Sequence, residues 1–536
     1  MKPGAMSFHH PLAFWAGGTL LVAGVLSHLP MFLMGRHTGW QMVGMPMDGW
    51  MLTGMALIPL GLGLAFHGLM PRLGRMRHLL PAGEAVQFHL ADSVGLNREH
   101  WKVVAVLVVA LTVDVMKPAT TGFVIPGLTA EYNISTRSAG WLALVALMGT
   151  TVGSLVWGRL ADAYGRRAAI LLSALMFMGT AICGAMPAFG WNLAMCFLMG
   201  ASAGGLLPIT FTLMAEIIPT AHRGWLLVAL GGIGTSAGYL AAAAAATWLE
   251  PMFSWRALWL LGLPTGALII LLNRFIPESP RFLSAAGLPQ QARAVLAQFS
   301  GAVPVAKGDA AEVTIAAVEA TCHPAEAGTL LRGAHARIGA GLAMCGIGWG
   351  LVTFGFVLWL PVNLVRLGVD ADAASALLAQ SALLALPGIG LVVWLYHRWS
   401  TIRSLVAFIA LTALALAAFA VIDLGGLRSV TATTLATAAL LVSSGGVIAM
   451  LIPYAAEIYP AAVRGTGAGM IAASSKFGGI LGAGLGVLGL FEHVALSALA
   501  IALAMAVSGL VLARHGVETR GRRLEEIQRA LAVAAA

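Results

Sequence analysis

Charged side chains are scarce in this chain of 536 residues. Asp, Glu, Lys and Arg make up 10% of the chain and hydrophobic residues 59%, whereas soluble domains contain about 25% charged residues. A soluble fold of this length could not cover its surface with so few charges. The apolar residues form continuous runs of about 20, the length of a transmembrane helix, without the alternation typical of a membrane barrel. We therefore expect an all-α membrane protein.

Cysteine and the common catalytic motifs are equally sparse. The cysteines share no CxxC or ligand spacing, which argues against a disulfide framework and a zinc site. No G-x-x-x-x-G-K-[ST] loop occurs, which disfavours a primary pump. No catalytic triad or metal-hydrolase spacing occurs either, so we expect neither an enzyme nor a cofactor. The four cysteines are Cys183, Cys196, Cys322 and Cys345.

Fourteen apolar runs are long enough to cross a bilayer. The first, which follows Lys2, is too long for a signal-peptide core and lacks a clear cleavage site, so we interpret it as a retained helix. An even number of spans places both termini on the same side of the membrane. The predicted spans are 12–34, 49–70, 102–127, 140–160, 168–187, 190–215, 225–247, 257–274, 338–361, 373–395, 404–422, 430–454, 466–490 and 493–513.

Lys and Arg are distributed unevenly between the loops. With a cytoplasmic N-terminus, 24 of the 31 lie in cytoplasmic segments, five in the opposite loops, and two, Lys117 and Lys476, inside spans. This positive-inside pattern predicts cytoplasmic termini, with the bacterial inner membrane as the expected location. It also accounts for the net charge of +9, so we expect no nucleic-acid partner.

The chain contains an internal repeat. A-E-I-I-P-T-A-H-R-G at 215–224 and A-E-I-Y-P-A-A-V-R-G at 456–465 agree at seven of ten positions, 241 residues apart. Each copy follows the fourth span of a six-span block, which predicts a transporter built from two pseudo-symmetric halves around a midplane cavity. The predicted domains are two extra helices and a connector at 1–100, a six-helix bundle at 101–276, a cytoplasmic linker at 277–336, a second six-helix bundle at 337–514 and a cytoplasmic tail at 515–536.

Three further motifs complete the pattern: G-R-L-A-D-A-Y-G-R-R at 158–167, P-E-S-P-R at 277–281 and V-E-T-R-G-R-R-L-E-E-I at 517–527. Over about residues 102–527 the chain resembles the major facilitator superfamily, and particularly its sugar-porter and organic-ion-transporter branch. The tail motif of that branch usually begins Pro-Glu-Thr, and a Val replaces the Pro here. The resemblance implies the two-bundle fold, extended here by two N-terminal helices, and transport by alternating access.

The motifs also supply candidate gating residues. Gly158 and Gly165 are expected to permit a tight turn between two helices. Asp162 precedes the next helix, whose positive N-terminal dipole favours a carboxylate. Arg166 or Arg167 is able to pair with Asp162 or with the Glu of the first repeat copy. The resemblance implies that such pairs form a cytoplasmic gate, and positive-inside anchoring is the alternative. The candidates are Gly158, Asp162, Gly165, Arg166, Arg167, Glu216, Arg223, Glu457 and Arg464.

In the second bundle the counterpart of the first loop motif, L-Y-H-R-W-S-T-I-R from 395, is degenerate. His397 stands where Asp162 does, and Ser400 where Gly165 does. The two halves are therefore expected to differ at the loop that follows their second span.

Three charged side chains fall inside the twelve-helix body: Asp114, Lys117 and Lys476. Unpaired burial costs each of them about 2.5–3.5 kcal/mol. Asp114 and Lys117 lie three residues apart and are able to pair, and Pro118 loosens the helix beside them. We expect Asp114 to carry a coupling proton and the two lysines to bind a substrate anion. Mutual neutralisation that only fixes packing is the alternative.

Aromatic side chains outnumber amides in the spans of the second bundle. Trp349, Phe356 and Gln380 are the candidate substrate contacts, and no Gln-Gln pair of the hexose-transporter type occurs. This composition favours an aromatic or other organic anion over a sugar. Placement in the interfacial aromatic belt is the alternative for the Trp and Phe residues.

Methionine is concentrated in the first outer loop and its edges. Thioether and imidazole groups bind copper, but Met is also a flexible apolar packing residue, so no metal is assigned. His28 and His67 lie in the two extra spans and are able to face one another. Bracing of the bundle or support of an oligomer is the other hypothesis for these spans. The weak copper candidates are Met31, Met34, His37, Met42, Met45 and Met47.

Together these patterns predict a proton-coupled secondary active transporter for a small organic anion. Its partners are a small-molecule substrate, protons and the lipid bilayer. Sugar/H⁺ symport, copper-linked transport and a non-transporting receptor or scaffold are the alternative hypotheses.

Overall fold

The computed structural model describes residues 10–69, 94–300, 327–358, 360, 387–388, 390–426 and 430–533. These residues form helices and contain no strand, which confirms the all-α prediction. Twelve of the helices are long and apolar enough to cross a membrane, and they correspond to twelve of the fourteen predicted spans. The span predicted at 466–490 is occupied by α21 (Arg464–Val487). Most of the span predicted at 373–395 lies outside the described residues.

Contacts between residues divide the chain into two compact units. Unit 1 comprises Met1–Pro219, Ile233–Glu326 and Ala461–Gly469; unit 2 comprises Thr220–Gly232, Ala327–Pro460 and Met470–Ala536. Each unit therefore contains a short segment from the other half of the sequence. Helix α10 (Thr220–Phe253) contributes residues to both units, as does α21.

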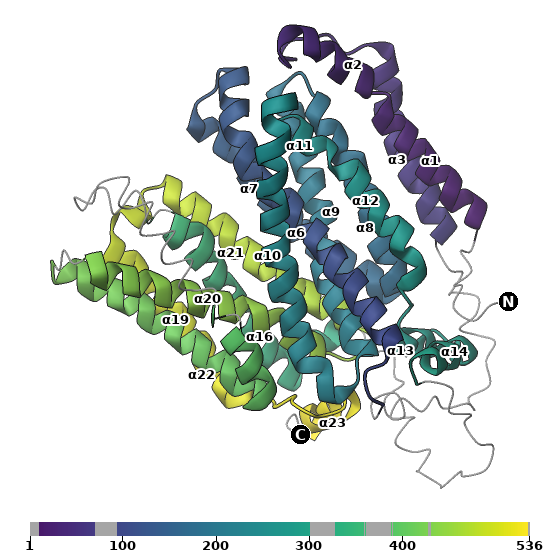
Figure 1. Cartoon of the computed structure of the whole chain (residues 1–536). Helices are drawn as coiled ribbons and strands as arrows, with labels where there is room; N and C mark the ends of the chain where they lie inside the picture. The colour runs from purple at the N-terminus through teal and green to yellow at the C-terminus, as the bar shows by residue number, and fades with distance from the viewer. Residues whose placement is uncertain are drawn as a thin grey trace. The chain divides into compact units, whose positions relative to one another are not determined.

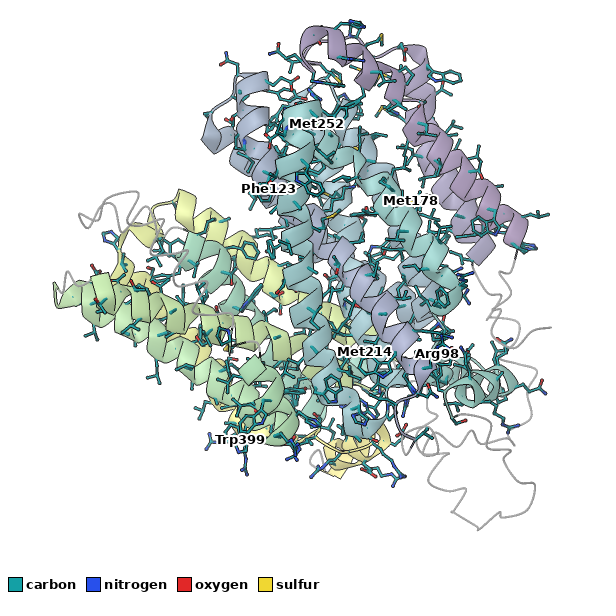
Figure 2. All side chains as sticks on the ribbon, in the orientation of Figure 1. Arg98, Phe123, Met178, Met214, Met252 and Trp399 are labelled. Atoms are coloured by element: carbon teal, nitrogen blue, oxygen red, sulfur yellow. The ribbon has the colours of Figure 1, made fainter. Side chains whose placement is uncertain are left out.

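Unit 1 is a bundle built on three consecutive helices (Figure 1). Helix α9 (Phe189–Ile217) packs against α7 (Thr136–Tyr164) and α8 (Arg166–Gly179). Nearly every residue of α8 is buried, including Met178, and Met214 of α9 is buried as well (Figure 2). An apolar helix that is buried on all sides forms the core of its bundle. The other elements are α6 (Arg98–Tyr132), η2 (Thr180–Ala185), α11 (Ala257–Leu260), α12 (Gly262–Leu271), η3 (Leu272–Phe275), α13 (Pro280–Ala285) and α14 (Pro289–Ser300).

Local signals set the ends of the long helices in unit 1. The side chain of Asn97 caps the start of α6, and Asn133 ends this helix in a left-handed conformation with φ 50°. Ser135 caps the start of α7, and Gly165 follows its last residue. The Asn97 amide also donates to the carbonyl oxygen of Phe299, which holds α14 against the start of α6.

The two extra helices form a hairpin within unit 1. Helices α1 (Pro11–Leu26) and α3 (Gly49–Leu69) pack along each other, and both contact α8. The approach is close, because a Cβ atom on Gly24 would lie 2.7 Å from the Gly54 carbonyl oxygen. Small residues at such interfaces are typical of membrane helices. The contact with α8 supports the bracing hypothesis. Between the two helices lie α2 (Leu29–Met34) and η1 (Gly35–Thr38).

The two histidines of these extra spans do not meet, contrary to the expectation. The ring of His67 stacks on His10 with centroids 5.4 Å apart. His28 is buried, and its Nδ1 lies 2.9 Å from the Gly24 carbonyl oxygen. The two helices run antiparallel, so His28 lies at one end of the hairpin and His67 at the other.

The methionine-rich segment packs as an apolar cluster. Met31 and Met42 are buried together with Phe32, Met51 and Ala257. Met45 and Met47 pack against this cluster, whereas Met34 and His37 are exposed. Apolar packing accounts for the burial of these thioethers, and copper binding stays a hypothesis.

Unit 2 is a second helical bundle. Helix α19 (Thr401–Leu424) packs against α20 (Val430–Ile458) and α22 (Val494–His515), and α22 packs against α16 (Gly333–Gly350). Helix α16 continues into a π-helix, Leu351–Val357, a widened turn that is frequent at functional sites. The other elements are η4 (Ala327–Leu331), η6 (Leu490–Glu492) and α23 (Leu524–Val533).

Candidate functional site

Four charged side chains of unit 1 form a buried network, the Glu216 cluster: Asp162, Arg166, Glu216 and Arg464. The two oxygens of Glu216 accept hydrogen bonds from Arg166 at 3.1 and 3.2 Å. Arg464 pairs with Glu216 at 2.6 Å, and Arg166 lies 3.3 Å from Asp162. The side chains of both arginines are at most 1% exposed. Arg166 therefore contacts both of the carboxylates that the sequence offered as alternatives.

The carboxylate of Asp162 caps helix α21. It accepts hydrogen bonds from the backbone N–H groups of Gly465 (2.9 Å) and Thr466 (2.7 Å) and from the Thr466 hydroxyl (2.8 Å). The expectation that Asp162 acts on the dipole of the next helix, α8, is wrong. The dipole that it meets belongs to a helix about 300 residues later in the chain, a contact that only packing within unit 1 creates.

Glu278 of the P-E-S-P-R motif takes the place at α8 that was expected for Asp162. Its carboxylate accepts from the backbone N–H groups of Arg166 at 2.8 Å and Arg167 at 3.2 Å. Burial raises the pKa of Glu278, and its hydrogen bonds and Arg166 oppose that rise. The motif was noticeable in the sequence, but its spacing did not indicate a helix cap. Gly165, with φ 105°, supplies the turn before α8, and a Cβ there would strike the same carboxylate.

Gly158 has a different role from the one expected. It lies inside α7, seven residues before the turn, so it does not form the turn with Gly165. A Cβ on Gly158 would lie 2.4 Å from the Gly465 carbonyl oxygen, so Gly158 permits the close approach of the segment that Asp162 caps. Arg167 does not join the Glu216 cluster, since its Nε donates to Asn273 at 2.7 Å.

A second buried carboxylate lies in unit 2, in the Glu457 cluster: Arg223, Tyr396, Glu457 and Thr519. One Glu457 oxygen accepts from the hydroxyls of Thr519 (2.6 Å) and Tyr396 (3.2 Å). Arg223, which is 1% exposed, interacts electrostatically with the same carboxylate. The repeat thus pairs the Glu of each copy with the Arg of the other copy: Glu216 with Arg464, and Glu457 with Arg223. The sequence placed all four residues as candidates but did not predict this exchange.

Glu518 of the tail motif does in unit 2 what Glu278 does in unit 1. It accepts from the backbone N–H of Thr401 at 3.0 Å and from the hydroxyls of Ser400 and Thr401, at the start of α19. Burial raises its pKa, but these hydrogen bonds outweigh burial and leave the pKa lowered. The V-E-T-R motif resembles a family tail motif, but its sequence alone indicated no role for the Glu.

The charged pair predicted in α6 separates in the structure. Lys117 is 1% exposed, and its ammonium donates to the Thr180 hydroxyl at 2.7 Å and the Phe177 carbonyl oxygen at 3.2 Å. Among the described residues these oxygens, rather than Asp114, are the hydrogen-bond acceptors of Lys117. Asp114 is also buried, at 4% exposure. Both side chains lie inside unit 1, so the expected local ion pair is replaced by a contact between α6 and α8.

Two predicted substrate contacts meet in unit 2. The ammonium of Lys476 on α21 lies 5.7 Å from the centre of the Trp349 ring at the end of α16. Both side chains are partly exposed, and the π-helix follows Trp349 after one residue. Phe356 is 1% exposed and packs on Phe419, which makes it a core residue. Gln380 lies outside the described residues.

The sequence also missed a buried ion pair between distant residues of unit 1. Arg256 pairs with Glu131 at 2.7 Å and donates to the carbonyl oxygens of Gly184 and Met186. The same carboxylate accepts from the backbone N–H of Met42 at 2.7 Å, which ties the methionine-rich segment to the bundle. No spacing signal links residues so far apart in the chain.

Comparisons with known proteins point in one direction. The model of the Major Facilitator Superfamily matches residues 103–483. The niacin transporter NiaP of Acinetobacter baylyi is 26% identical over 447 residues, which cover 81% of this chain and 98% of that protein. The 4-hydroxybenzoate transporter PcaK of Pseudomonas aeruginosa is 29% identical over 458 residues, 81% of this chain and 97% of that protein.

A solved structure shows the same fold. The proton:xylose symporter XylE of E. coli, bound to 6-bromo-6-deoxy-D-glucose, superposes with a TM-score of 0.63 at 18% identity. The match covers 80% of this chain and 98% of that chain. At this identity the likeness concerns the fold alone.

Proposed function

The chain belongs to the major facilitator superfamily of membrane transporters, and we propose that it moves an aromatic carboxylate or a similar organic anion by proton-coupled alternating access. As a member of this family it is a multi-pass membrane protein and not an enzyme. We also propose that both termini are cytoplasmic, because 24 of the 31 Lys and Arg residues then lie on that side.

The pairing of Lys476 with Trp349 carries the substrate proposal. An aromatic carboxylate offers a negative charge and a flat ring, and this pair offers an ammonium and an indole face 5.7 Å apart. A ring stacks on an aromatic face, and a carboxylate binds an ammonium by charge-assisted hydrogen bonds. The relatives support this choice, since niacin and 4-hydroxybenzoate are both aromatic carboxylates.

Asp114 is the proposed proton carrier. It is the acidic side chain buried in the middle of α6, four residues before Pro118, which lies inside the helix. Ionisable groups at this depth are costly and mark transport pathways. Plain neutralisation of nearby charge is the competing role.

Uptake into proteoliposomes tests the substrate proposal. Lys476→Met should weaken the uptake of 4-hydroxybenzoate or nicotinate about tenfold or more, the factor that accompanies loss of one charge-assisted hydrogen bond. Lys476→Arg, which keeps the cation, should retain most of the uptake. Equal loss for the acids and for their neutral amides would contradict an anion-binding role of Lys476.

Asp114→Asn tests the coupling proposal in the same vesicles. Accumulation driven by a pH gradient should disappear, while exchange of labelled for unlabelled substrate, which needs no net proton movement, should continue. Wild-type accumulation with unchanged pH dependence would remove Asp114 from the coupling mechanism.

The alternatives are separated by a ligand screen on the purified protein. Organic acids, sugars, amines and Cu(I) should raise the melting temperature only where they bind, since stabilisation grows with ligand concentration relative to Kd. Sugar/H⁺ symport predicts stabilisation by hexoses or pentoses, and copper-linked transport predicts stabilisation by Cu(I). A receptor or scaffold predicts binding without uptake.

A further inference from the structure

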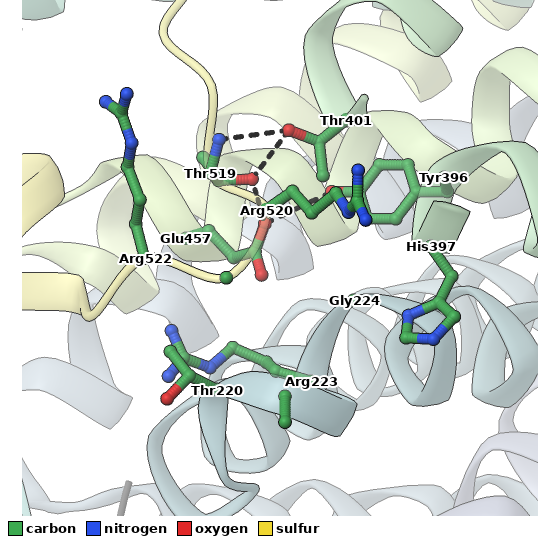
Figure 3. Close-up of a pocket in the computed structure, with 12 residues that line it drawn as sticks. Thr220, Arg223, Gly224, Tyr396, His397, Thr401, Glu457, Thr519, Arg520 and Arg522 are labelled. Carbon is green, nitrogen blue, oxygen red and sulfur yellow. Dashed lines mark hydrogen bonds between the residues drawn. The ribbon is translucent and has the colours of Figure 1, made fainter. Parts of the chain in front are cut away.

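Unit 2 contains a cavity of about 210 Å³ beside the Glu457 cluster (Figure 3). Three segments far apart in the sequence line it: the first turn of α10, the residues around the start of α19, and residues 519–522 of the tail. All three belong to unit 2. Part of the lining is buried and part is exposed, so the cavity reaches from the interior of the unit to its surface.

Positive charge predominates in the lining. The lining holds three arginines, Arg223, Arg520 and Arg522, but a single carboxylate, Glu457, and His397 lies at the same cavity (Figure 3). Partial burial and then the neighbouring cations, Arg520 among them, lower the pKa of His397. Glu457 balances one of the three guanidinium charges, so the lining keeps two positive charges without a carboxylate to balance them.

The tail arginines are not neutralised by other acids. Arg520 donates to the Trp399 carbonyl oxygen at 3.0 Å, which uses one of its donors but no negative charge. Within the described part of the chain, Arg522 has no side-chain hydrogen bond or ion pair. Glu518, the acid nearest to Arg520 in sequence, is occupied at the start of α19.

The difference between the two units explains why space is left here. In unit 1 the residue after Gly165 is Arg166, whose guanidinium lies against Glu216. In unit 2 the residue after Ser400, which stands where Gly165 does, is Thr401, whose side chain is much shorter. The carboxylate of Glu457 is therefore met by hydroxyl groups, and the space beside it stays open.

Polar groups suited to an anion surround this space. Helix α10 begins at Thr220, so the positive end of its dipole lies at the cavity. Arginine forks match the oxygens of phosphate in a bidentate geometry. The volume exceeds that of a water molecule several times over, since a water occupies about 30 Å³ of liquid.

We propose that this cavity is a binding site for a phosphate group, held by Arg223 at the base and by Arg520 and Arg522 of the tail. The phosphate comes from a soluble ion or ester, or from the headgroup of a phospholipid. Binding joins the tail to the first turn of α10 and to α19 and so stabilises unit 2. The site is separate from the transported anion at Lys476 and Trp349, and its test does not depend on transport.

The test uses the purified full-length protein, titrated with sodium phosphate against sodium chloride at equal ionic strength. Phosphate should raise the melting temperature in a saturable way, and chloride should not. Arg522→Gln should weaken the apparent Kd about tenfold or more, as expected for loss of a charge-assisted hydrogen bond. Arg522→Lys should weaken it less, because the charge stays. Arg529→Gln, an exposed arginine of the same tail that does not line the cavity, is the matched control.

Two further arms identify the source of the phosphate group. Glycerol 3-phosphate in detergent should compete with phosphate if the ligand is soluble. Nanodiscs of phosphatidic acid should stabilise the protein more than nanodiscs of phosphatidylcholine if the ligand is a lipid, and Arg522→Gln should abolish that difference.

Equal shifts by phosphate and chloride would overturn the proposal, as would an equal loss of affinity in Arg529→Gln. Arg520→Gln guards against misfolding of a single variant, since it too is exposed and should give the same loss. Unchanged phosphate affinity in both Arg520→Gln and Arg522→Gln, with normal melting temperatures, would also overturn it.

Discussion

Replacing Glu216 with Gln should strongly destabilise the protein, because it removes the shared partner of two buried cations. The side chain of Glu216 is fully buried, and it contacts Arg166 at 3.1 Å and Arg464 at 2.6 Å. Breaking a buried ion pair by removing one partner costs about 3–5 kcal/mol, since the other charge is left uncompensated. Asp162, 3.3 Å from Arg166, still offsets part of that charge.

Glu457→Gln is the matched comparison in unit 2. Its carboxylate meets one cation, Arg223, and its hydrogen bonds come from the hydroxyls of Tyr396 and Thr519. An amide oxygen is able to accept both of those hydrogen bonds. The expected cost is therefore lower than for Glu216→Gln, because one buried cation rather than two loses its carboxylate partner.

The assay is thermal unfolding in detergent followed with a thiol-reactive fluorescent dye. Cys183, Cys196 and Cys345 are buried and free, so in a Cys322→Ser background the dye reports when the bundles open. The melting temperature should fall further for Glu216→Gln than for Glu457→Gln. In the Glu216→Gln background, Arg464→Met should cost less than in the wild type, because its charge partner is already lost. Equal or reversed effects of the two Gln variants, or strict additivity with Arg464→Met, would refute the reasoning.

Three other predictions concern turns, packing and pH. Gly165→Ala should lower the melting temperature, because φ 105° strains a side chain and its Cβ meets a carboxylate, whereas Gly140→Ala, on open helix surface, should have no such cost. Gly24→Leu should loosen the N-terminal hairpin and increase its proteolysis, while Gly63→Leu, with open space around it, should leave proteolysis unchanged. Glu518→Gln should destabilise the protein at pH 7, because the pKa of the Glu518 carboxyl is lower in the folded than in the unfolded state. The ionised carboxylate therefore stabilises the fold fully above the unfolded-state pKa of about 4.3. This stabilisation is lost as the pH falls through the folded-state pKa. The melting-temperature difference from the wild type should therefore shrink in acid, and a constant difference would contradict that role.

The family resemblance that the motifs carried is confirmed by the match over residues 103–483. Twelve of the predicted spans reappear as helices long and apolar enough to cross a membrane, because hydropathy is a local property, summed over about 20 neighbouring residues. The sequence also placed the Glu and Arg of each repeat copy among the candidates, since a repeated motif is visible without any structure.

Predictions that depended on which neighbour a side chain meets were less successful. Asp162 caps α21 rather than α8, and Glu278 caps α8 instead. His67 meets His10 and not His28. Asp162 was assigned to the next helix in the chain, and His28 was chosen for His67 because both lie in the extra spans; the packing supplied other partners.

The amino-acid sequence alone indicates that most of this protein lies in lipid, where its helices run and which motifs are duplicated. The first two follow from the free energy of transferring neighbouring residues from water to lipid, and the third from residue identity. Which charges pair depends on how the helices pack in three dimensions. The Glu of each repeat copy interacts with the Arg of the other copy: Glu216 with Arg464, and Glu457 with Arg223. These interactions depend on short segments of the chain that pack into the opposite unit. Buried charges must find partners wherever packing places them, and packing brings together residues that local sequence patterns do not connect.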